Sequence, residues 1–313
     1  MPEAQVYLNG RMLPASQARV AIYDAGLVLG ATVTEQTRTF HHAPYHLEAH
    51  LDRFFHSLAA VGFEINETQD DLAAVSRELI ERNARLLRPG EELGLIQFVT
   101  AGEMAIYAGF ERGLCEPFAE GPTVCVHTFP LDGRRWAAAM RDGAHLVIPS
   151  IRQIPPQCVS PAIKCRSRMH YYLADREARA ADPRAWALLL DLDGRITETS
   201  SANFLLVERG AIVSPKLNET LPGISRGTVI ELARQLGIAF SERDVLPSEA
   251  LAADEAWLTS TPYCLLPVVK IDGAPIGSGR PGPLFRTFMA AWSELAGLDI
   301  ERQILESSGA VVG

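Results

Sequence analysis

The stretch WALLLDLDGRITETSSANFLLVERGAIVS, residues 186–214, decides the fold of this chain. Asp193-Gly194 and Arg209-Gly210 each separate two short apolar runs. A turn-forming dipeptide between such runs is typical of a β-hairpin. The pattern therefore predicts two successive hairpins, with strands over residues 186–191, 195–199, 204–207 and 211–214.

Helical periodicity flanks these hairpins on both sides. Apolar residues at helical spacing predict helices over residues 169–181 and 226–236, and a strand over 256–258 follows. The first 130 residues mix the two periodicities in the same way. They predict a hairpin over 6–13, strand-like pieces over 20–33, helices over 46–61 and 71–87, and strands over 93–100 and 123–128.

We therefore expect an α/β (α+β) chain with two domains, which also suits its 313 residues. Residues 1–130 would form a small N-terminal α+β domain. A linker would cover 131–137, where proline and glycine interrupt the periodic pattern. Residues 138–313 would form the large C-terminal domain.

The composition excludes several classes of protein. A hydrophobic fraction of 47% with 21% charged residues predicts a globular protein, and the net charge of −9 argues against a nucleic-acid binder. The five cysteines are odd in number and lack CxxC spacing, which predicts neither a disulfide framework nor a zinc site. We find no pattern of a signal peptide or a spanning helix, and we expect a cytoplasmic protein.

Lysine is rare in this chain, because only Lys164, Lys216 and Lys270 occur among 29 basic residues. Lys164 lies in an apolar setting after a proline-rich stretch. A partly desolvated lysine can become a neutral nucleophile and form a Schiff base with a carbonyl group, which arginine cannot do. A lysine that only forms a salt bridge, or that extends its charge to solvent, is the alternative interpretation.

Two further features accompany Lys164. The helix predicted from Arg226 follows Ser225, so its N-terminus offers free N–H groups and a hydroxyl to a phosphate. Glu198 stands at a strand end, before the loop that leads to Asn203. Either feature alone is common in proteins without such a ligand.

The order and spacing of these residues resemble the class IV (fold type IV) pyridoxal-phosphate aminotransferases. That group includes branched-chain and D-amino acid aminotransferases, aminodeoxychorismate lyases and R-selective amine transaminases. The resemblance covers nearly the whole chain. It is carried by Asp24-Ala25-Gly26 with Gly30, Arg53, Lys164, residues 193–198, Asn203-Phe204, residues 221–226 and residues 259–261.

The resemblance implies a role for each matching residue. Lys164 would hold pyridoxal 5'-phosphate as a Schiff base, and Glu198 would pair with the pyridine nitrogen. Arg53, Ile224, Ser225 and Thr261 would bind the phosphate. The implied cofactor site also includes Asn203, Leu221, Gly223 and Ser260, and the cofactor would lie between two α/β domains.

The implied reaction moves an amino group from an amino acid, branched-chain-like or D, or from an amine to an α-keto acid. A lyase of the aminodeoxychorismate type is the first alternative. A protein that binds the cofactor without turnover is a distant one. The resemblance also implies a homodimer, with small-molecule partners and neither nucleic acid nor membrane.

The substrate side departs from the known subgroups. Leu29 stands where branched-chain enzymes commonly carry a tyrosine, and Met169 replaces the tyrosine that bonds the cofactor's phenolic oxygen. His170 or Tyr171 would substitute for it. The group that binds the substrate carboxylate is not identified. The candidate substrate residues are Leu29, Thr34, Arg38, Gln97 and Pro262.

A histidine cluster offers one rival interpretation. His46 and His50 stand four residues apart, a spacing that places two metal ligands on one helical face. No third ligand follows at a suitable spacing. We therefore predict no metal site.

Overall fold

The computed structural model describes residues 3–114 and 121–307. The chain divides into two compact units. Unit 1 comprises residues 1–131 and 163–168, and unit 2 comprises residues 132–162 and 169–313. The short segment 163–168, which contains Lys164, thus belongs to unit 1 although the chain on both sides of it belongs to unit 2.

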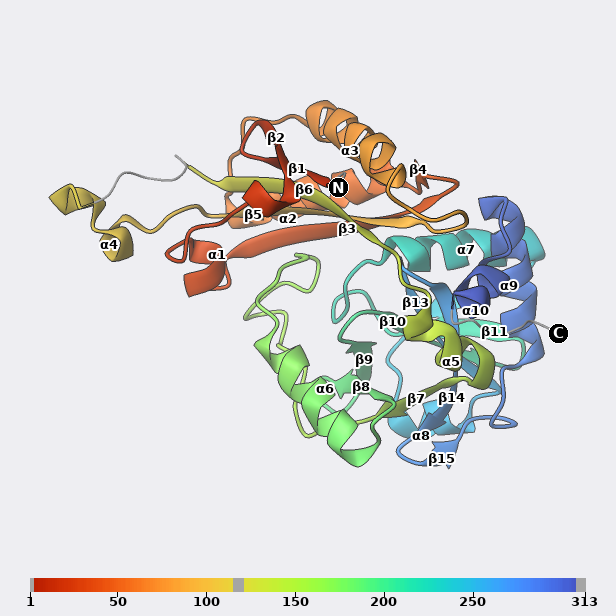
Figure 1. The fold of residues 1–313 in the computed structure, drawn as a ribbon. Coiled ribbons are helices and arrows are strands. Elements are labelled where there is room, and N and C mark those ends of the chain that lie inside the picture. The colour runs from red at the N-terminus through yellow and green to blue at the C-terminus, as the bar shows by residue number, and fades with distance from the viewer. Residues whose placement is uncertain (1–2, 115–120, 308–313) are drawn as a thin grey trace. The chain divides into compact units, whose positions relative to one another are not determined.

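Unit 1 is built on a six-stranded antiparallel sheet (Figure 1). Its first hairpin turns at Asn9 and Gly10, both with positive φ, as the Asn-Gly dipeptide predicts. The strand order is β2-β1-β6-β5-β3-β4. The strands are β1 (Gln5–Leu8), β2 (Arg11–Pro14), β3 (Thr32–Phe40), β4 (Ala43–Pro44), β5 (Leu93–Thr100) and β6 (Thr123–Pro130).

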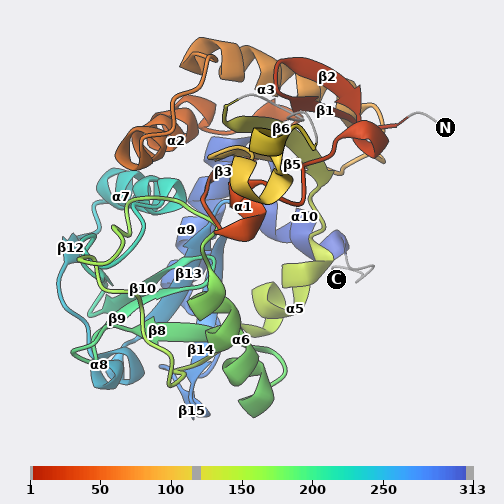
Figure 2. The same cartoon turned by 90° about the vertical axis from the view of Figure 1, so that its left-hand side faces the viewer.

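Helices α2 (Leu47–Val61) and α3 (Gln69–Ala84) cover one face of this sheet, as Figure 2 shows. Their apolar stripes pack against the inward side chains of β3, β5 and β6. Leu51 and Phe54 are fully buried there. Burial of such side chains contributes roughly 1.5 to 3 kcal/mol each, so this layer forms the core of unit 1.

Two expectations for unit 1 were wrong in detail. Residues 20–33 are not all strand-like, because Ala25–Val28 forms the short helix α1, whose first turn is capped when the Gly26 N–H donates to Asp24 at 2.7 Å. Helix α3 begins at Gln69 and ends at Ala84, earlier than predicted at both ends. Thr68 and Asp71 form a capping box that fixes its start.

Segment 163–168 adds a further strand-like edge beside β3. Cys165 forms an antiparallel bridge with Val33. The Thr34 N–H donates to the Lys164 carbonyl at 2.9 Å, and the Arg166 N–H donates to the Thr32 carbonyl at 3.0 Å. These bonds join residues far apart in sequence, and the sequence pattern did not predict them.

Unit 2 contains a nine-stranded mixed sheet. Because β9 pairs with both β8 and β10, the strands close into a ring. The two hairpins of residues 186–214 are confirmed as β8 to β11. The strands are β7 (Ala144–Val147), β8 (Ala185–Leu190), β9 (Ile196–Thr199), β10 (Asn203–Glu208), β11 (Ala211–Ser214), β12 (Phe240–Glu242), β13 (Glu255–Ser260), β14 (Cys264–Ile271) and β15 (Ala274–Pro275).

Six helices accompany this sheet in the part of unit 2 that the structure describes. Helix α6 packs its small residues Ala174 and Ala178 on β8, and α7 and α9 contact β13. Helix α5 begins at Arg134, inside the segment predicted as a linker. The helices are α5 (Arg134–Asp142), α6 (Met169–Ala181), α7 (Ile224–Leu236), α8 (Pro247–Ala252), α9 (Pro283–Ala296) and α10 (Ile300–Glu306).

The helices in residues 3–114 and 121–307 are too short or too polar to cross a bilayer.

Candidate active site

Glu198 ends β9 as a buried carboxylate that accepts hydrogen bonds from four neutral groups. Its Oε1 accepts from the Tyr171 hydroxyl at 2.8 Å and, more weakly, from the Gln153 amide at 3.4 Å. Its Oε2 accepts from the Asn203 amide and the Leu221 N–H, both at 3.1 Å. Neutral donors stabilise a carboxylate in its charged form. Glu198 is thus oriented from both of its oxygens.

Hydrogen bonds connect Glu198 with Tyr171 and His170 of α6 and with Gln153. Gln153 donates from its amide nitrogen to the Tyr171 hydroxyl at 2.7 Å, and its amide oxygen lies 3.0 Å from His170 Nε2. Since that oxygen can only accept, His170 Nε2 carries the hydrogen. The Tyr171 hydroxyl accepts from Gln153 and therefore donates to Glu198. Either His170 or Tyr171 was predicted to replace the missing phenolic-oxygen tyrosine, and that role stays a prediction.

The N-terminus of α7 is suited to bind an anion. Gly223 is its N-cap and makes no side-chain cap bond, and Ser225 in the first turn is buried. A Cβ at Gly223 would overlap Asn203 Oδ1. Glycine is thus required where Asn203 closes on the helix, and Asn203 also donates to the Leu221 carbonyl at 2.9 Å. The predicted residues Asn203, Leu221, Gly223, Ile224 and Ser225 are therefore neighbours within unit 2.

Ser260 and Thr261 lie where β13 ends. The Ser260 hydroxyl donates to the Ser201 carbonyl at 2.6 Å, in the loop between β9 and β10. Thr261 and Pro262 are half-buried in the turn before β14, and Tyr263 behind them is buried. The turn is thus tied to the loop that follows Glu198.

Lys164 is half-buried and held at two backbone atoms in unit 1. Its carbonyl accepts from Thr34, and its N–H donates to the Ser57 hydroxyl at 3.2 Å. Ser57 in turn donates to the Arg53 carbonyl at 3.0 Å. The backbone of the predicted catalytic lysine is thus attached to β3 and to α2.

Arg53 is buried on α2 and makes a bidentate ion pair with Glu35 of β3. Its Nε and one terminal nitrogen donate to the two Glu35 oxygens at 2.8 and 2.7 Å. His50 Nδ1 lies 3.1 Å from the same carboxylate. Burial raises the pKa of Glu35, but the Arg53 charge and the bonds from His50 and Arg53 outweigh burial and hold it well below its usual range. Glu35 thus fixes the guanidinium that was predicted to bind phosphate.

His50 is occupied by this carboxylate rather than presented with His46 to a metal. Burial lowers the pKa of His50, Glu35 opposes that shift, and the charges of Arg53 and Lys164 reinforce it. His50 is therefore neutral near pH 7. His46 lies at the N-cap of α2 with a left-handed backbone.

The candidate substrate residues of unit 1 do not share one environment. Leu29 is exposed, whereas the Thr34 hydroxyl donates to the Gln97 carbonyl at 3.1 Å. The Gln97 side chain donates to Ser76 of α3 at 3.2 Å, on the helix-covered face of the sheet. Arg38 is buried with its guanidinium 3.9 Å from the Phe40 ring centroid.

Several residues of the site were missed by the sequence analysis. Glu35 was not recognised as the partner of Arg53, nor Gln153 and Tyr171 as partners of Glu198. Glu35 alternates with Val33 and Thr37 on the helix-covered face of β3, and a charged residue at such an inward position is the signal that marks such a partner.

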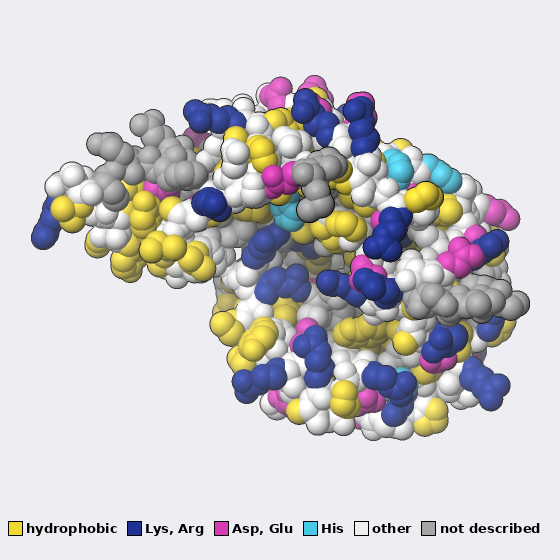
Figure 3. Space-filling view, viewed as in Figure 1, with side chains coloured by type: hydrophobic (Ala, Val, Ile, Leu, Met, Phe, Trp, Pro, Cys, Tyr) yellow, Lys and Arg dark blue, Asp and Glu magenta, His cyan; other side chains and the backbone are white. Residues whose placement is uncertain are grey.

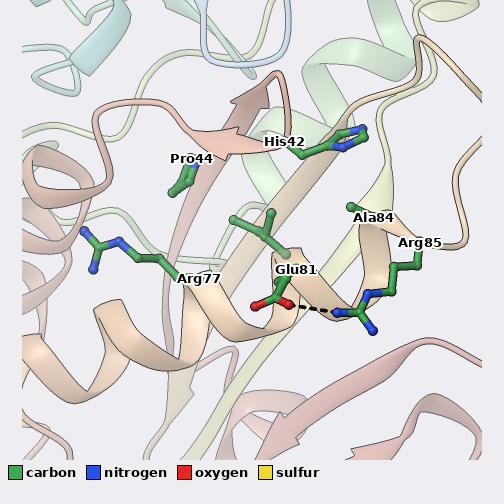
Figure 4. A pocket seen from close by; sticks show the side chains of 7 residues that line it. His42, Pro44, Arg77, Glu81, Ala84 and Arg85 are labelled. Carbon is green, nitrogen blue, oxygen red and sulfur yellow. Dashed lines mark hydrogen bonds and ion pairs between the residues drawn. The ribbon is translucent and has the colours of Figure 1, made fainter.

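A surface pocket of about 400 Å³ lies apart from these residues, between the β4 turn and α3 (Figure 4). Arg85 pairs with Glu81 at 2.8 Å on its rim. Its lining side chains were not predicted as site residues. They are His42, Pro44, Arg77, Ile80, Glu81, Ala84 and Arg85.

The family model for amino-transferase class IV matches residues 32–271. The chain therefore belongs to the class IV aminotransferases, enzymes that transfer amino groups with pyridoxal phosphate. Among its relatives, the D-alanine aminotransferase of Bacillus licheniformis is 30% identical over 288 residues, covering 92% of this chain and 95% of the relative. Branched-chain-amino-acid aminotransferase-like protein 1 of Arabidopsis thaliana is 31% identical over 295 residues, and the chain spans 50% of that relative's length.

Solved structures share the fold type IV architecture that was predicted. The branched-chain amino acid aminotransferase of Escherichia coli superimposes with a TM-score of 0.84 at 25% identity and covers 94% of both chains. A branched-chain amino acid aminotransferase from T.th., solved with pyridoxamine 5'-phosphate, gives a TM-score of 0.80 at 25% identity, over 98% of this chain and 97% of that one. The predicted family and fold class are confirmed.

The residues present fit pyridoxal phosphate. An oriented, buried carboxylate suits a protonated pyridine nitrogen, and an uncapped helix N-terminus with a buried serine suits a phosphate. A lysine held at its backbone suits the aldehyde group.

Proposed function

We propose that this chain is a pyridoxal-phosphate-dependent transaminase that moves an amino group from an amino acid or amine to an α-keto acid. Lys164 holds the cofactor covalently, and Glu198 pairs with the pyridine nitrogen. Arg53, the α7 N-terminus at Ile224 and Ser225, and Thr261 bind the phosphate. When bound, the cofactor supplies an electron sink for the substrate's α-carbon.

The observation that carries this proposal is the environment of Glu198. Four donors orient both oxygens of this buried carboxylate. This arrangement suits a hydrogen bond from a protonated pyridine nitrogen. As a neutral amine, Lys164 would take the proton from the substrate's α-carbon, hold it at Nζ and deliver it to the carbon that had carried the cofactor's aldehyde group.

The amino donor belongs to the same proposal. Relatives with about 30% identity include a D-alanine aminotransferase and branched-chain-like proteins, so either class of amino acid is a candidate donor. A lyase of the aminodeoxychorismate type remains the alternative function. Release of pyruvate from an aminated chorismate, without a need for a keto acid, would favour the lyase.

The proposal also includes a homodimeric state and a cytoplasmic location. Large apolar side chains gather over α1 and over α4 (Ala105–Ala108), as Figure 3 shows. The two segments are neighbours, because the Met104 N–H donates to the Tyr23 carbonyl. Such a patch favours burial against a second copy, and sedimentation of the protein measures this. The exposed side chains are Ile22, Leu27, Leu29, Ile106, Tyr107 and Leu114. Cys125, Cys158 and Cys165 are present as thiols, which suits a reducing compartment.

The test is the visible absorption of the protein with pyridoxal phosphate, before and after addition of L-leucine, D-alanine or R-1-phenylethylamine. We expect a band from covalently bound cofactor that one donor bleaches, and turnover once a keto acid is added. Lys164→Ala should lose both the band and turnover. Lys216→Ala, which removes an exposed lysine paired with Asp244, is the matched control. Wild-type rates in Lys164→Ala would refute the assignment.

A further inference from the structure

Arg166 follows the proposed catalytic lysine by two residues in the strand-like segment beside β3. Its N–H donates to the Thr32 carbonyl, and the neighbouring bridge pairs Cys165 with Val33. Residues opposite one another in an antiparallel pair point to the same face of the sheet. Arg166 therefore shares the face of Thr32, while Cys165 shares the opposite face with Val33, which packs in the helix-covered core.

The position of the Arg166 side chain confirms this face. Its guanidinium carbon lies 5.0 Å from the centroid of the Phe98 ring on β5, within the range of a cation–π contact. Phe98 pairs with Thr34 in the sheet, and its ring contacts His127 of β6 with centroids 6.4 Å apart. Arg166 thus lies over the Phe98 ring on the face of the sheet that α2 and α3 do not cover.

The charge of Arg166 is not balanced locally. Within residues 3–114 and 121–307, no carboxylate forms an ion pair with Arg166. Most of the ion pairs in these ranges do involve another arginine. Burial lowers the pKa of Arg166, Cys125 opposes this shift, and the charge of Arg168 adds a smaller lowering influence. Burial lowers the pKa of His127, and the charge of Arg166 lowers it further. Arg166 is itself exposed, so its guanidinium is accessible to an anion.

Lys164 and Arg166 lie on the same side of their segment. Side chains alternate along extended backbone, so residues two apart point the same way and their Cα atoms are separated by about 7 Å. An amino acid carries its carboxylate one bond from the carbon that bears the amino group. A substrate whose amino group meets Lys164 therefore has its carboxylate within reach of a flexible arginine two residues on.

We propose that Arg166 binds the carboxylate of the amino-acid and keto-acid substrates and so sets the specificity of this enzyme for acids over plain amines. The proposal rests on the proposed transaminase function. It supplies the carboxylate-binding group that the sequence analysis left unidentified. The Phe98 ring beneath holds the planar guanidinium, which can then donate two parallel bonds to a carboxylate.

The first experiment compares substrates with and without a carboxylate. Arg166→Gln should lower kcat/KM for the preferred amino acid and its keto acid by about 30-fold or more, which corresponds to about 2 kcal/mol. It should leave kcat/KM for R-1-phenylethylamine within about threefold. Arg166→Lys keeps the positive charge but loses the forked guanidinium that can donate two parallel bonds. Its kcat/KM for the amino acid should therefore lie between those of wild type and Arg166→Gln. Arg11→Gln, which changes an exposed arginine of β2, is the matched control.

The second experiment measures binding without turnover. Calorimetry with 4-methylvalerate and with glutarate should show both acids weakened at least tenfold by Arg166→Gln if Arg166 binds the α-carboxylate. Weakening of glutarate alone would place the contact at a distal carboxylate and would overturn the proposal. Unchanged affinity for both acids would overturn it.

The two proposals can fail separately. If the wild-type protein forms no covalent cofactor band, the transaminase function fails before Arg166 is tested. If the wild type turns over amino acids and Arg166→Gln does so equally well, only the role of Arg166 is refuted. Unfolding curves of both variants in urea check that the fold is intact.

Discussion

Two buried carboxylates, Glu35 in unit 1 and Glu198 in unit 2, differ in the groups that surround them. Glu35 accepts from the cation Arg53 and from His50. The donors to Glu198 are two amides, a hydroxyl and a backbone N–H. A carboxylate paired with a cation is already neutralised, so its effect is to fix the arginine. The neutral dipoles around Glu198 orient both of its oxygens, which suits the pyridine-nitrogen partner proposed for it.

Glu255 of β13 shows that this comparison does not extend to every buried carboxylate. It is also buried and accepts from neutral groups, namely Trp257 Nε1 and the N–H groups of Leu284 and Phe285. Two of these donors belong to the first turn of α9, whose dipole favours a negative charge. Glu255 therefore caps a helix, and neutral donors alone do not define a functional carboxylate.

The largest effect is expected from Glu198→Gln. Removal of the charge opposite the pyridine nitrogen should lower kcat by about 10³-fold, or about 4 kcal/mol, while the cofactor still binds. Single-turnover absorbance measurements report this step. Glu255→Gln is the control, and it should destabilise the fold with little effect on kcat. Equal kcat values for wild type and Glu198→Gln would show that Glu198 is misassigned.

Glu35→Gln should act on stability. The substitution leaves the buried Arg53 without its counter-charge, which should lower the free energy of unfolding by about 3 kcal/mol. Urea unfolding measures the change. Glu48→Gln on the same helix as Arg53 removes an exposed pair with Arg77 and should lower it by less than about 1 kcal/mol. A loss no greater than that of Glu48→Gln would mean that Arg53 does not depend on Glu35.

A smaller effect is expected from Tyr171→Phe, which removes one donor to Glu198 and the acceptor of Gln153. Loss of one such bond corresponds to about 1.4 kcal/mol, or about tenfold in kcat. Because Glu198 would become a weaker partner of the pyridine nitrogen, a pH titration of the bound cofactor's absorbance should also shift. Tyr172→Phe, at the exposed neighbour, should change neither.

The smallest expected effect is on the free energy of unfolding at acidic pH. The pKa of His50 is lowered in the folded state, so His50 contributes stability above its unfolded pKa near 6.5 that is lost as pH falls below it. The free energy of unfolding should therefore fall as the pH drops from 7 toward 5.5. Relative to wild type, His50→Gln should flatten the fall in free energy of unfolding over that window. His56→Gln, at an exposed position of α2, should not.

Local patterns predicted the elements well. Helix α6 and strands β5 and β11 have the predicted bounds, because each has a clear periodicity between turn signals. Contacts between distant elements were not predictable. No local pattern shows that Glu35 faces Arg53 or that Gln153 reaches Tyr171, since both pairs depend on tertiary packing. The roles of the site residues in binding the cofactor stay predictions.

The edge of β3 depends on the order in which the chain is made. Residues 32–34 receive their second neighbour only from segment 163–168, which leaves the ribosome after residues 132–162. Domains generally fold as they emerge, so the sheet of unit 1 spends part of synthesis with an open edge that can pair with other chains. The segment with the proposed catalytic lysine thus also closes an aggregation-prone edge, and a chain cut before it should associate with copies of itself.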